Sequence, residues 1–245
     1  MGTIVNTGAV LLGSLLGVFL KRGISDRLRE TLMRSVGTAT IFIGISGALS
    51  EMLKIEDGKL SSNGILLMCV SLALGSVIGE LLHIEERLEG LGDKIREMKI
   101  FRNSGDFTEG FVSATLVICI GAMSIVGPLK DALDGDPSIL YTKSILDFIS
   151  TMIFASTLGI GVLCSAVPMF LYQGAFTLCA GLVEPYLYSL GDGNLVSNIS
   201  SVGSVLIFGV GVNLLFGKKL RVGNMLPALI IPVFWAVIQR LFHLV

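Results

Sequence analysis

Residues 139–174 constrain this chain most, because most of the stretch is apolar enough to cross a lipid bilayer. It nevertheless carries Lys143 and Asp147 near its start, a series of Ser and Thr residues in its middle, two close glycines and a proline. A helix that only faces lipid needs none of these, whereas a helix that lines a polar path or packs closely on others can use all of them. The stretch therefore predicts membrane helices with a polar role inside a bundle.

Composition places the whole chain in the membrane class. Of its 245 residues, 52% are hydrophobic and 15% are charged, and the mean hydropathy is +0.81. A soluble domain of this size could not bury so much apolar surface. The net charge of −1 gives no reason to expect nucleic acid, so the expected partner is the lipid bilayer. No low-complexity linker separates a second domain, and residues 1–245 are expected to form a single integral membrane domain.

We expect an all-α, polytopic transmembrane helix bundle of eight spans, since a span needs about 20 mainly apolar residues. The charged segments after spans one and three suit short interfacial helices. Almost nothing polar separates spans five and six, so either a tight turn or one broken, re-entrant element fits there. The expected spans are residues 2–20, 36–52, 64–82, 107–129, 140–163, 167–183, 199–216 and 225–244.

Two similar segments indicate an internal repeat. LLGSLLGVFL at residues 11–20 resembles LALGSVIGEL at residues 72–81, and a similar short piece follows each. This predicts a two-helix unit used at least twice in the same orientation. The glycines in these segments form small faces that allow close helix approach. A homodimer through such Gly-rich faces fits the sequence.

Basic residues predict the orientation. All but five of the 18 lysines and arginines lie in the connections after spans one, three and seven. The positive-inside rule then places these connections in the cytoplasm and both termini outside it. This assignment depends on there being eight spans, because with seven the two termini would lie on opposite sides.

Lys143 and Asp147 are the first candidate site residues. They are four positions apart, so they share one face of a helix. One interpretation is an interfacial pair in which Lys143 extends to the headgroups. The other makes Asp147 a proton or cation carrier that faces an inner cavity, with Lys143 setting its charge, because a carboxylate in a membrane is costly unless it is paired or hydrated.

Further polar side chains fall inside the expected spans. Gln173, Asn6 and Asn213 are amides that need a partner, either another helix or a ligand. Ser156 and Thr157 can bond back to their own helix or coordinate a solute or ion at mid-depth. These five residues, with Lys143 and Asp147, are the candidate substrate- or ion-binding residues.

Motifs for catalysis and for cofactors are missing from the sequence. Nothing resembles a nucleophile elbow, a P-loop or a zinc-protease helix, so an enzyme is not expected. The four cysteines lie in apolar segments and are interpreted as free thiols. No Cys/His cluster indicates a metal site, and no cofactor is expected.

Three stretches resemble a known family. GTIVNTGAVLLGSLLG at the start, GDPSILYTKSILDFISTMIFASTLGIGVLCSAVPMFLYQG in the centre and GVNLLFGKKLRVGNMLPALI near the end are similar to the YdfK/YqgA-like family of bacterial integral membrane proteins. The resemblance covers essentially the whole chain. It implies a multi-pass protein of the bacterial cytoplasmic (inner) membrane, in a family loosely labelled as transport proteins, and it supplies neither substrate nor functional residues.

The sequence favours a transporter of a small solute or ion. Its path would run between the central broken helices, because many polar groups and helix breakers lie within the spans. The alternative is a non-transporting membrane scaffold, or a subunit of a larger membrane complex, in which the polar groups only hold helices together. A passive channel would require a hydrated pore at an oligomer axis.

Overall fold

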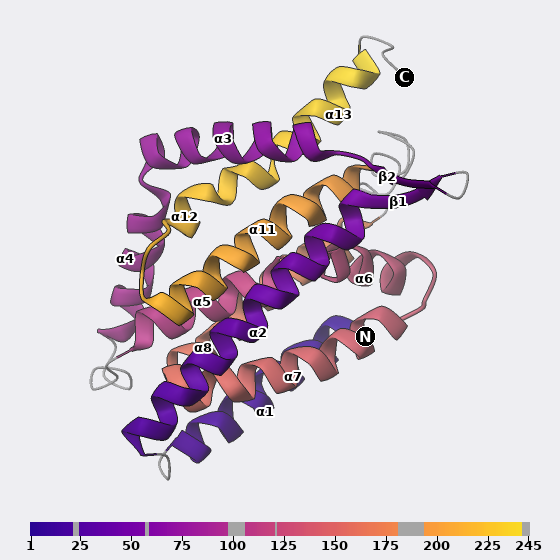
Figure 1. The fold of residues 1–245 in the computed structure, drawn as a ribbon. Coiled ribbons are helices and arrows are strands. Elements are labelled where there is room, and N and C mark those ends of the chain that lie inside the picture. The colour runs from indigo at the N-terminus through magenta and orange to yellow at the C-terminus, as the bar shows by residue number, and fades with distance from the viewer. Residues whose placement is uncertain (22–24, 57–58, 98–105, 121, 181–193, 242–245) are drawn as a thin grey trace.

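The computed structural model describes the chain except for residues 22–24, 57–58, 98–105, 121, 181–193 and 242–245. Most of the described chain is helical, and long helices lie side by side in one bundle (Figure 1). The all-α bundle expected from the sequence is therefore confirmed. The longer helices are α1 (Gly2–Lys21), α2 (Asp26–Met52), α3 (Ile65–Leu82), α4 (Ile84–Arg96), α5 (Phe107–Cys119), α6 (Ala122–Leu133), α7 (Ser138–Leu158), α9 (Ala166–Leu178), α11 (Asn194–Phe216) and α13 (Ile231–Leu241).

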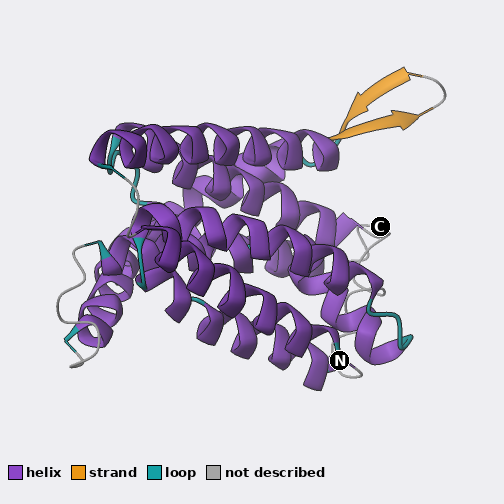
Figure 2. Cartoon of the chain, turned by 90° about the horizontal axis from the view of Figure 1, so that it is seen from below, coloured by secondary structure: helices purple, strands orange, loops and turns teal. Residues whose placement is uncertain are grey.

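Short elements join the helices. The hairpin of β1 (Leu53–Glu56) and β2 (Lys59–Ser62) connects α2 to α3. It projects beyond the helices (Figure 2). The single turn α8 (Gly161–Cys164) precedes α9, and α12 (Val222–Met225) and the 3-10 turn η1 (Leu226–Leu229) precede α13.

Glycines allow α1 and α7 to pack backbone to backbone. A Cβ atom at Gly13 would collide with the carbonyl of Phe148, and one at Gly17 with the carbonyl of Met152. Four residues further along α1, from Gly13 to Gly17, the contact moves four residues along α7, from Phe148 to Met152. The two helices therefore run parallel. The equivalent glycine of the second similar segment, Gly79, lies against the backbone of α12 in the same way. Both Gly-rich faces are thus filled within one chain, and the homodimer stays a prediction.

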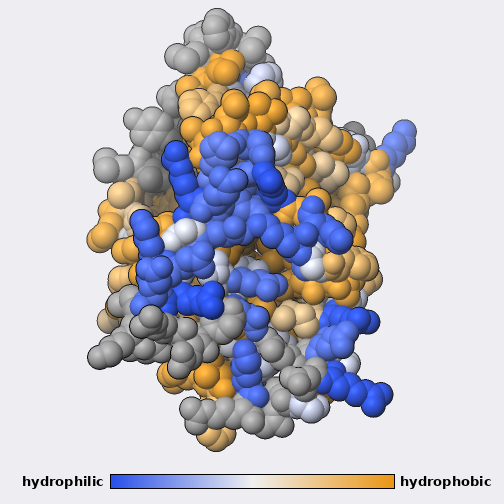
Figure 3. Space-filling view, turned by 90° about the vertical axis from the view of Figure 1, so that its left-hand side faces the viewer, coloured by the Kyte–Doolittle hydropathy of each residue, from blue (hydrophilic) through white to orange (hydrophobic). Residues whose placement is uncertain are grey.

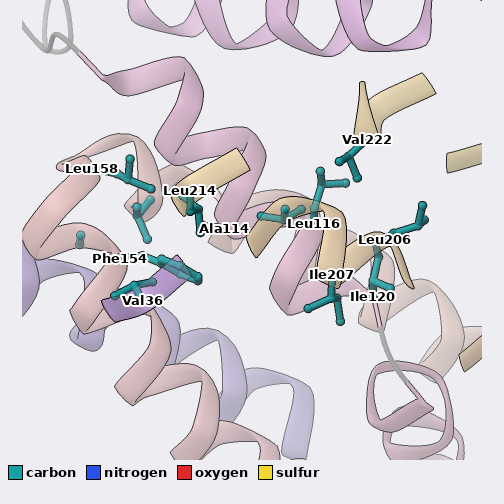
Figure 4. Packing of buried hydrophobic residues seen from close by; sticks show 13 residues of the cluster. Val36, Ala114, Leu116, Ile120, Phe154, Leu158, Leu206, Ile207, Leu214 and Val222 are labelled. Atoms are coloured by element: carbon teal, nitrogen blue, oxygen red, sulfur yellow. The ribbon is translucent and has the colours of Figure 1, made fainter. Parts of the chain in front are cut away.

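A hydrophobic core forms around α11. In α11, 61% of the span is buried, against 17–39% in the other candidate spans. Side chains of α2, α5, α7 and α11 meet there, among them Val36, Ala114, Phe154 and Leu206 (Figure 4). These aliphatic and aromatic side chains fill the space between helices whose outer faces carry exposed Leu, Ile, Val and Phe. Apolar side chains therefore lie both inside the bundle and around it, as a bilayer requires.

The turn between the fifth and sixth expected spans is tight. α7 ends at Leu158, and Gly159 has φ +85°, a conformation that side chains with a Cβ rarely adopt. Thr3 of α1 contacts Thr177 of α9, and Asn6 contacts Gln173, so α9 runs antiparallel to α1. Because α1 and α7 are parallel, α9 is also antiparallel to α7. Residues Ser138–Leu158 and Gly161–Leu178 are each long and apolar enough to cross a membrane, so the structure favours a tight turn between two spans over one broken element.

The fourth expected span is broken instead. Its halves α5 and α6 make an angle of 56°. Within the described residues, seven helices are long and apolar enough to cross a membrane, and the α5–α6 pair gives an eighth if it is one span. The second expected span is longer than predicted, because the charged segment from Asp26 continues directly into α2 instead of forming a separate interfacial helix.

The bundle has two distinct ends. One end carries the hairpin and the start of α1, and we call it the hairpin end (Figure 1). The other carries α4 and hydrophilic side chains framed by apolar surface (Figure 3), and we call it the basic end. Its lysines and arginines include Lys21, Lys94, Arg96, Lys218, Lys219 and Arg221.

Candidate functional site

Lys143 and Asp147 form a buried ion pair inside the bundle. They lie one turn apart on α7, and Lys143 Nζ is 2.9 Å from Asp147 Oδ1 and 2.8 Å from Oδ2. Their side chains are only 7% and 8% exposed. Of the two interpretations of this pair, the structure excludes the one in which Lys143 extends to the headgroups.

Two amides from other helices complete the cluster. Asn6 of α1 donates through Nδ2 to Asp147 Oδ2 at 3.0 Å and to Gln173 Oε1 of α9 at 3.2 Å. Both Asn6 and Gln173 are fully buried. We call Asn6, Lys143, Asp147 and Gln173 the polar cluster. Residues from three helices, spread over most of the chain, meet in it because α1 packs between α7 and α9.

The break between α5 and α6 provides a backbone ligand. Lys143 Nζ donates to the carbonyl oxygen of Ile118 at 2.9 Å, and Ser124 Oγ donates to the same oxygen at 3.0 Å. Ile118 lies in the last turn of α5, where carbonyls lose their helical partners. A side-chain ammonium and a hydroxyl replace them, which satisfies this carbonyl at a broken helix within the membrane.

The polar cluster also holds unpaired atoms. Among the described residues, Asn6 Oδ1 and Gln173 Nε2 are buried side-chain atoms without a hydrogen-bond partner. Buried polar groups nearly always find a partner in protein or water. The cluster therefore has one acceptor and one donor whose hydrogen-bonding capacity the described residues do not use.

Two pockets lie between the polar cluster and the basic end. The first has a volume of about 340 Å³ and is lined by polar side chains that include Glu85, Glu89 and Lys218. The second, of about 330 Å³, is mainly apolar and reaches Cys119 and Ile120, beside the α5–α6 break. Val112 and Leu116 line both pockets, so the pockets adjoin.

The comparison with known proteins agrees over nearly the whole length. A family model described as "Protein of unknown function (DUF554)" matches residues 1–237. The chain belongs to the DUF554 family. It is 35% identical over 231 residues to "Uncharacterized membrane protein YdfK" of Bacillus subtilis (strain 168), with 94% of this chain and 93% of that protein covered.

A second relative comes from another bacterium. The DUF554 chain is 31% identical over 237 residues to "Uncharacterized protein YqgA" of Escherichia coli (strain K12), with 94% of both proteins covered. No solved structure matches the chain. The relatives and the apolar helices together identify this DUF554 chain as a membrane protein.

The other predicted site residues of the DUF554 chain lie outside the polar cluster. Ser156 Oγ donates to the Ile153 carbonyl at 2.7 Å, and Thr157 Oγ1 to the Phe154 carbonyl at 2.9 Å, so both bond back to α7. Asn213 lies near the basic end. Its Oδ1 accepts hydrogen bonds from the backbone N–H groups of Lys219 and Leu220, each at 2.8 Å, so it fastens the turn after α11 instead of joining the cluster.

Sequence reasoning missed a second polar network, at the basic end. Glu85 is buried and accepts from the Gly223 N–H at 3.0 Å, and its own N–H donates to Asn224 Oδ1 at 2.8 Å. Asn224 Nδ2 in turn donates to Glu80 Oε2 at 2.6 Å. Lys218 Nζ pairs with Glu85 Oε1 at 2.7 Å. This network ties α3 and α4 to α12, and no spacing in the sequence identifies its members as neighbours.

Proposed function

We propose that this DUF554 protein transports a small solute or ion across the membrane, between α1, the broken pair α5–α6, α7 and α9. One observation carries the proposal: a buried charged cluster sits at a helix break, next to a pocket that reaches Cys119 and Ile120. Charged groups within a membrane are costly and usually mark substrate or ion pathways. Broken helices at membrane depth are tolerated where they are buried in protein or line a water-filled cavity.

The adjoining pockets suggest the route. A solute would enter the first pocket at the basic end, pass Val112 and Leu116 into the second, and reach the α5–α6 break at Cys119. Beyond the break stands the Ile118 carbonyl, which Lys143 contacts. Because the polar cluster is buried, transport requires a conformational change that opens it.

The placement in the membrane is part of the proposal. The basic end would face the cytoplasm of a bacterium under the positive-inside rule, in the inner membrane, with both termini outside. The parallel run of α1 and α7 fits three crossings between them, by α2, α3 and the α5–α6 pair. The α9 span, α11 and residues Val222–Gln239 then bring the number of crossings to eight. We propose transport and not catalysis, since the cluster offers no nucleophile with an adjacent base.

A specific observation favours the alternative of a non-transporting scaffold or complex subunit. Each side chain of the polar cluster has at least one partner inside the bundle, as expected of groups that only hold helices together. Interhelical hydrogen bonds of this kind are common in membrane proteins and contribute about 0.6 kcal/mol each on average. Helix packing alone does not account for the unpaired atoms Asn6 Oδ1 and Gln173 Nε2.

A transport assay separates the two functions. The purified full chain is reconstituted into liposomes, which are incubated with an isotopically labelled extract of small bacterial metabolites and salts, and the lumenal contents are measured by mass spectrometry. We expect at least one solute or ion to accumulate above protein-free liposomes. Asp147→Asn, which keeps the shape of the side chain, should reduce that accumulation about tenfold or more, because charged intramembrane groups are usually functional.

Two results would count against the proposal. If nothing accumulates with folded protein in the bilayer, the scaffold function is favoured. If a solute accumulates equally with Asp147→Asn, the transport path does not use the polar cluster. Arg34→Met is the control, because Arg34 pairs with Glu30 on the exposed surface of α2, away from the path.

A further inference from the structure

The ammonium of Lys143 sits in a set of oxygen atoms. Both carboxylate oxygens of Asp147 lie within 2.9 Å of it, and the Ile118 carbonyl oxygen is also at 2.9 Å. These atoms come from α7 and from the end of α5. Carboxylate and carbonyl oxygens are the ligands that hard cations use in proteins. Lys143 therefore occupies the position that a small cation would take.

An unused oxygen belongs to the same cluster. Asn6 is bonded to Asp147 through its nitrogen, while Asn6 Oδ1 has no partner and is fully buried. An amide oxygen is a further hard ligand, and a water held by Gln173 Nε2, the other unpaired atom, could add one more. The cluster thus offers more oxygen ligands than the Lys143 ammonium uses.

The helix break favours positive charge at this position. The Ile118 carbonyl is in the last turn of α5, and the C-terminal end of a helix carries partial negative charge. In membrane transporters, the C-terminal ends of half-helices and unwound carbonyls coordinate Na⁺ near the middle of the bilayer. α5, which stops at Cys119 and is followed by α6 at an angle of 56°, provides such an end.

We propose that the polar cluster is a binding site for a monovalent alkali cation, with Lys143 as a tethered ammonium that competes for it. This inference rests on the proposed transport function, for which it names the substrate class. The cation is held by Asp147 and the Ile118 carbonyl once Lys143 withdraws, and Asn6 Oδ1 is an unused oxygen in the same cluster. The tethered competitor keeps the site neutral when the cation is absent, which avoids an unpaired buried carboxylate.

The charge of the site selects a monovalent ion. Asp147 is the single carboxylate in the polar cluster, so one positive charge neutralises it. Among the described residues, no three His, Cys, Asp or Glu side chains gather as a metal-binding group. Ca²⁺ usually takes six to eight oxygens, several from carboxylates, so a divalent ion would leave uncompensated charge in the membrane.

Removing the competitor tests the site. The purified full chain is heated in NaCl, in KCl and in choline chloride at equal ionic strength, so that only a bound alkali ion raises the Tm above choline. The Tm of native protein should rise only slightly in NaCl or KCl, because Lys143 competes for the site. In Lys143→Met the half-saturating cation concentration should fall about tenfold or more, because the bound conformation no longer competes with the ammonium. Lys143→Gln, which keeps a hydrogen-bonding side chain, serves if Lys143→Met does not fold.

Further variants decide the outcome. The alkali effect should vanish in the double variant Lys143→Met with Asp147→Asn, and Arg34→Met, which removes the cation of an exposed pair with the same spacing, should behave as native. The absence of any alkali effect in both Lys143 variants would overturn the inference, as would an alkali effect that survives the loss of Asp147.

Uptake of radiolabelled Na⁺ and of a K⁺ tracer into liposomes separates this inference from the proposed function. Alkali binding without uptake of any solute or ion would keep the site and overturn transport. Accumulation of another solute by a protein that binds no alkali ion would keep transport and overturn the cation site.

Discussion

Asn6 of α1 and Asp147 of α7 are 141 positions apart in the sequence, and the Asn6 amide donates to the Asp147 carboxylate at 3.0 Å. This hydrogen bond joins the two helices at the depth of the α5–α6 break, and the same amide nitrogen also reaches Gln173. Asn6 is therefore the link between the ion pair and α9. Its position explains why a polar residue stands so early in an apolar helix.

Replacing Asn6 with Ala should destabilise the bundle. The change leaves Gln173 Oε1 without its donor and removes one of the donors to Asp147, and a buried unsatisfied group costs about 1–3 kcal/mol. The free energy of unfolding, measured by SDS titration in mixed micelles, should fall by that amount. Thr7→Ala is the control, because the Thr7 hydroxyl donates to the Thr3 carbonyl on its own helix. Equal losses in both variants would contradict the role given to Asn6.

The Lys143–Asp147 pair should show strong coupling in a double-mutant cycle. Removing one partner of a buried pair costs about 3–5 kcal/mol, because the other charge is left uncompensated. We expect Lys143→Met and Asp147→Asn each to lower the free energy of unfolding by about this much, and the double variant to lower it by much less than the sum. Additive losses would mean that the two side chains do not depend on one another.

A side chain should be tolerated at Gly8 but not at Gly17. A Cβ atom at Gly17 would collide with the Met152 carbonyl, whereas one at Gly8 meets nothing within 4 Å. Overpacking costs about 1–3 kcal/mol, and alanine is better than glycine in a helix by about 0.5–1 kcal/mol. Gly17→Ala should therefore lower the Tm in a thermal unfolding assay, and Gly8→Ala should leave it unchanged or raise it. A neutral Gly17→Ala would argue against the close α1–α7 contact.

The Lys218 ion pairs should stabilise the basic end only below alkaline pH. Partial burial lowers the pKa of Lys218, but hydrogen bonds to Glu85 and Glu89 outweigh this and hold the pKa above 10.5. A pKa raised in the folded state gives stability that is present below the unfolded value and lost as the pH rises through the folded value. The Tm advantage of native protein over Lys218→Met should thus be full at neutral pH and shrink above 10.5. An advantage that grows with pH would contradict the pairing.

Part of the polar cluster could be predicted from the sequence. Lys143 and Asp147 are four positions apart in an apolar helix, so their shared face follows from helix geometry alone. Asn6 and Gln173 were candidates because buried amides need partners, but their meeting depends on α1 packing between α7 and α9. Asn213 is also an amide, but it lies near the end of α11, outside the polar cluster. There its side chain accepts hydrogen bonds from the N–H groups of Lys219 and Leu220 in the turn that follows.

The broken span was harder to foresee. The sequence predicted one continuous span over residues 107–129, whereas the helix breaks between Cys119 and Ala122. There the freed Ile118 carbonyl is satisfied by Lys143 from another helix, and nothing local in the sequence signals that partner.

Hydrophobicity and helix periodicity are local properties, so the membrane class, the helical content and the approximate limits of most spans could be predicted from the amino-acid sequence. So could the side chains that are too polar to face lipid. The folded arrangement was needed to learn which helices are neighbours and that α1 and α7 run parallel. It was also needed to see that Ile118, Lys143, Asp147 and Asn6 converge. Packing between segments far apart in the chain depends on matching surfaces, such as the glycines of α1 against the backbone of α7, and such matches have no local signature.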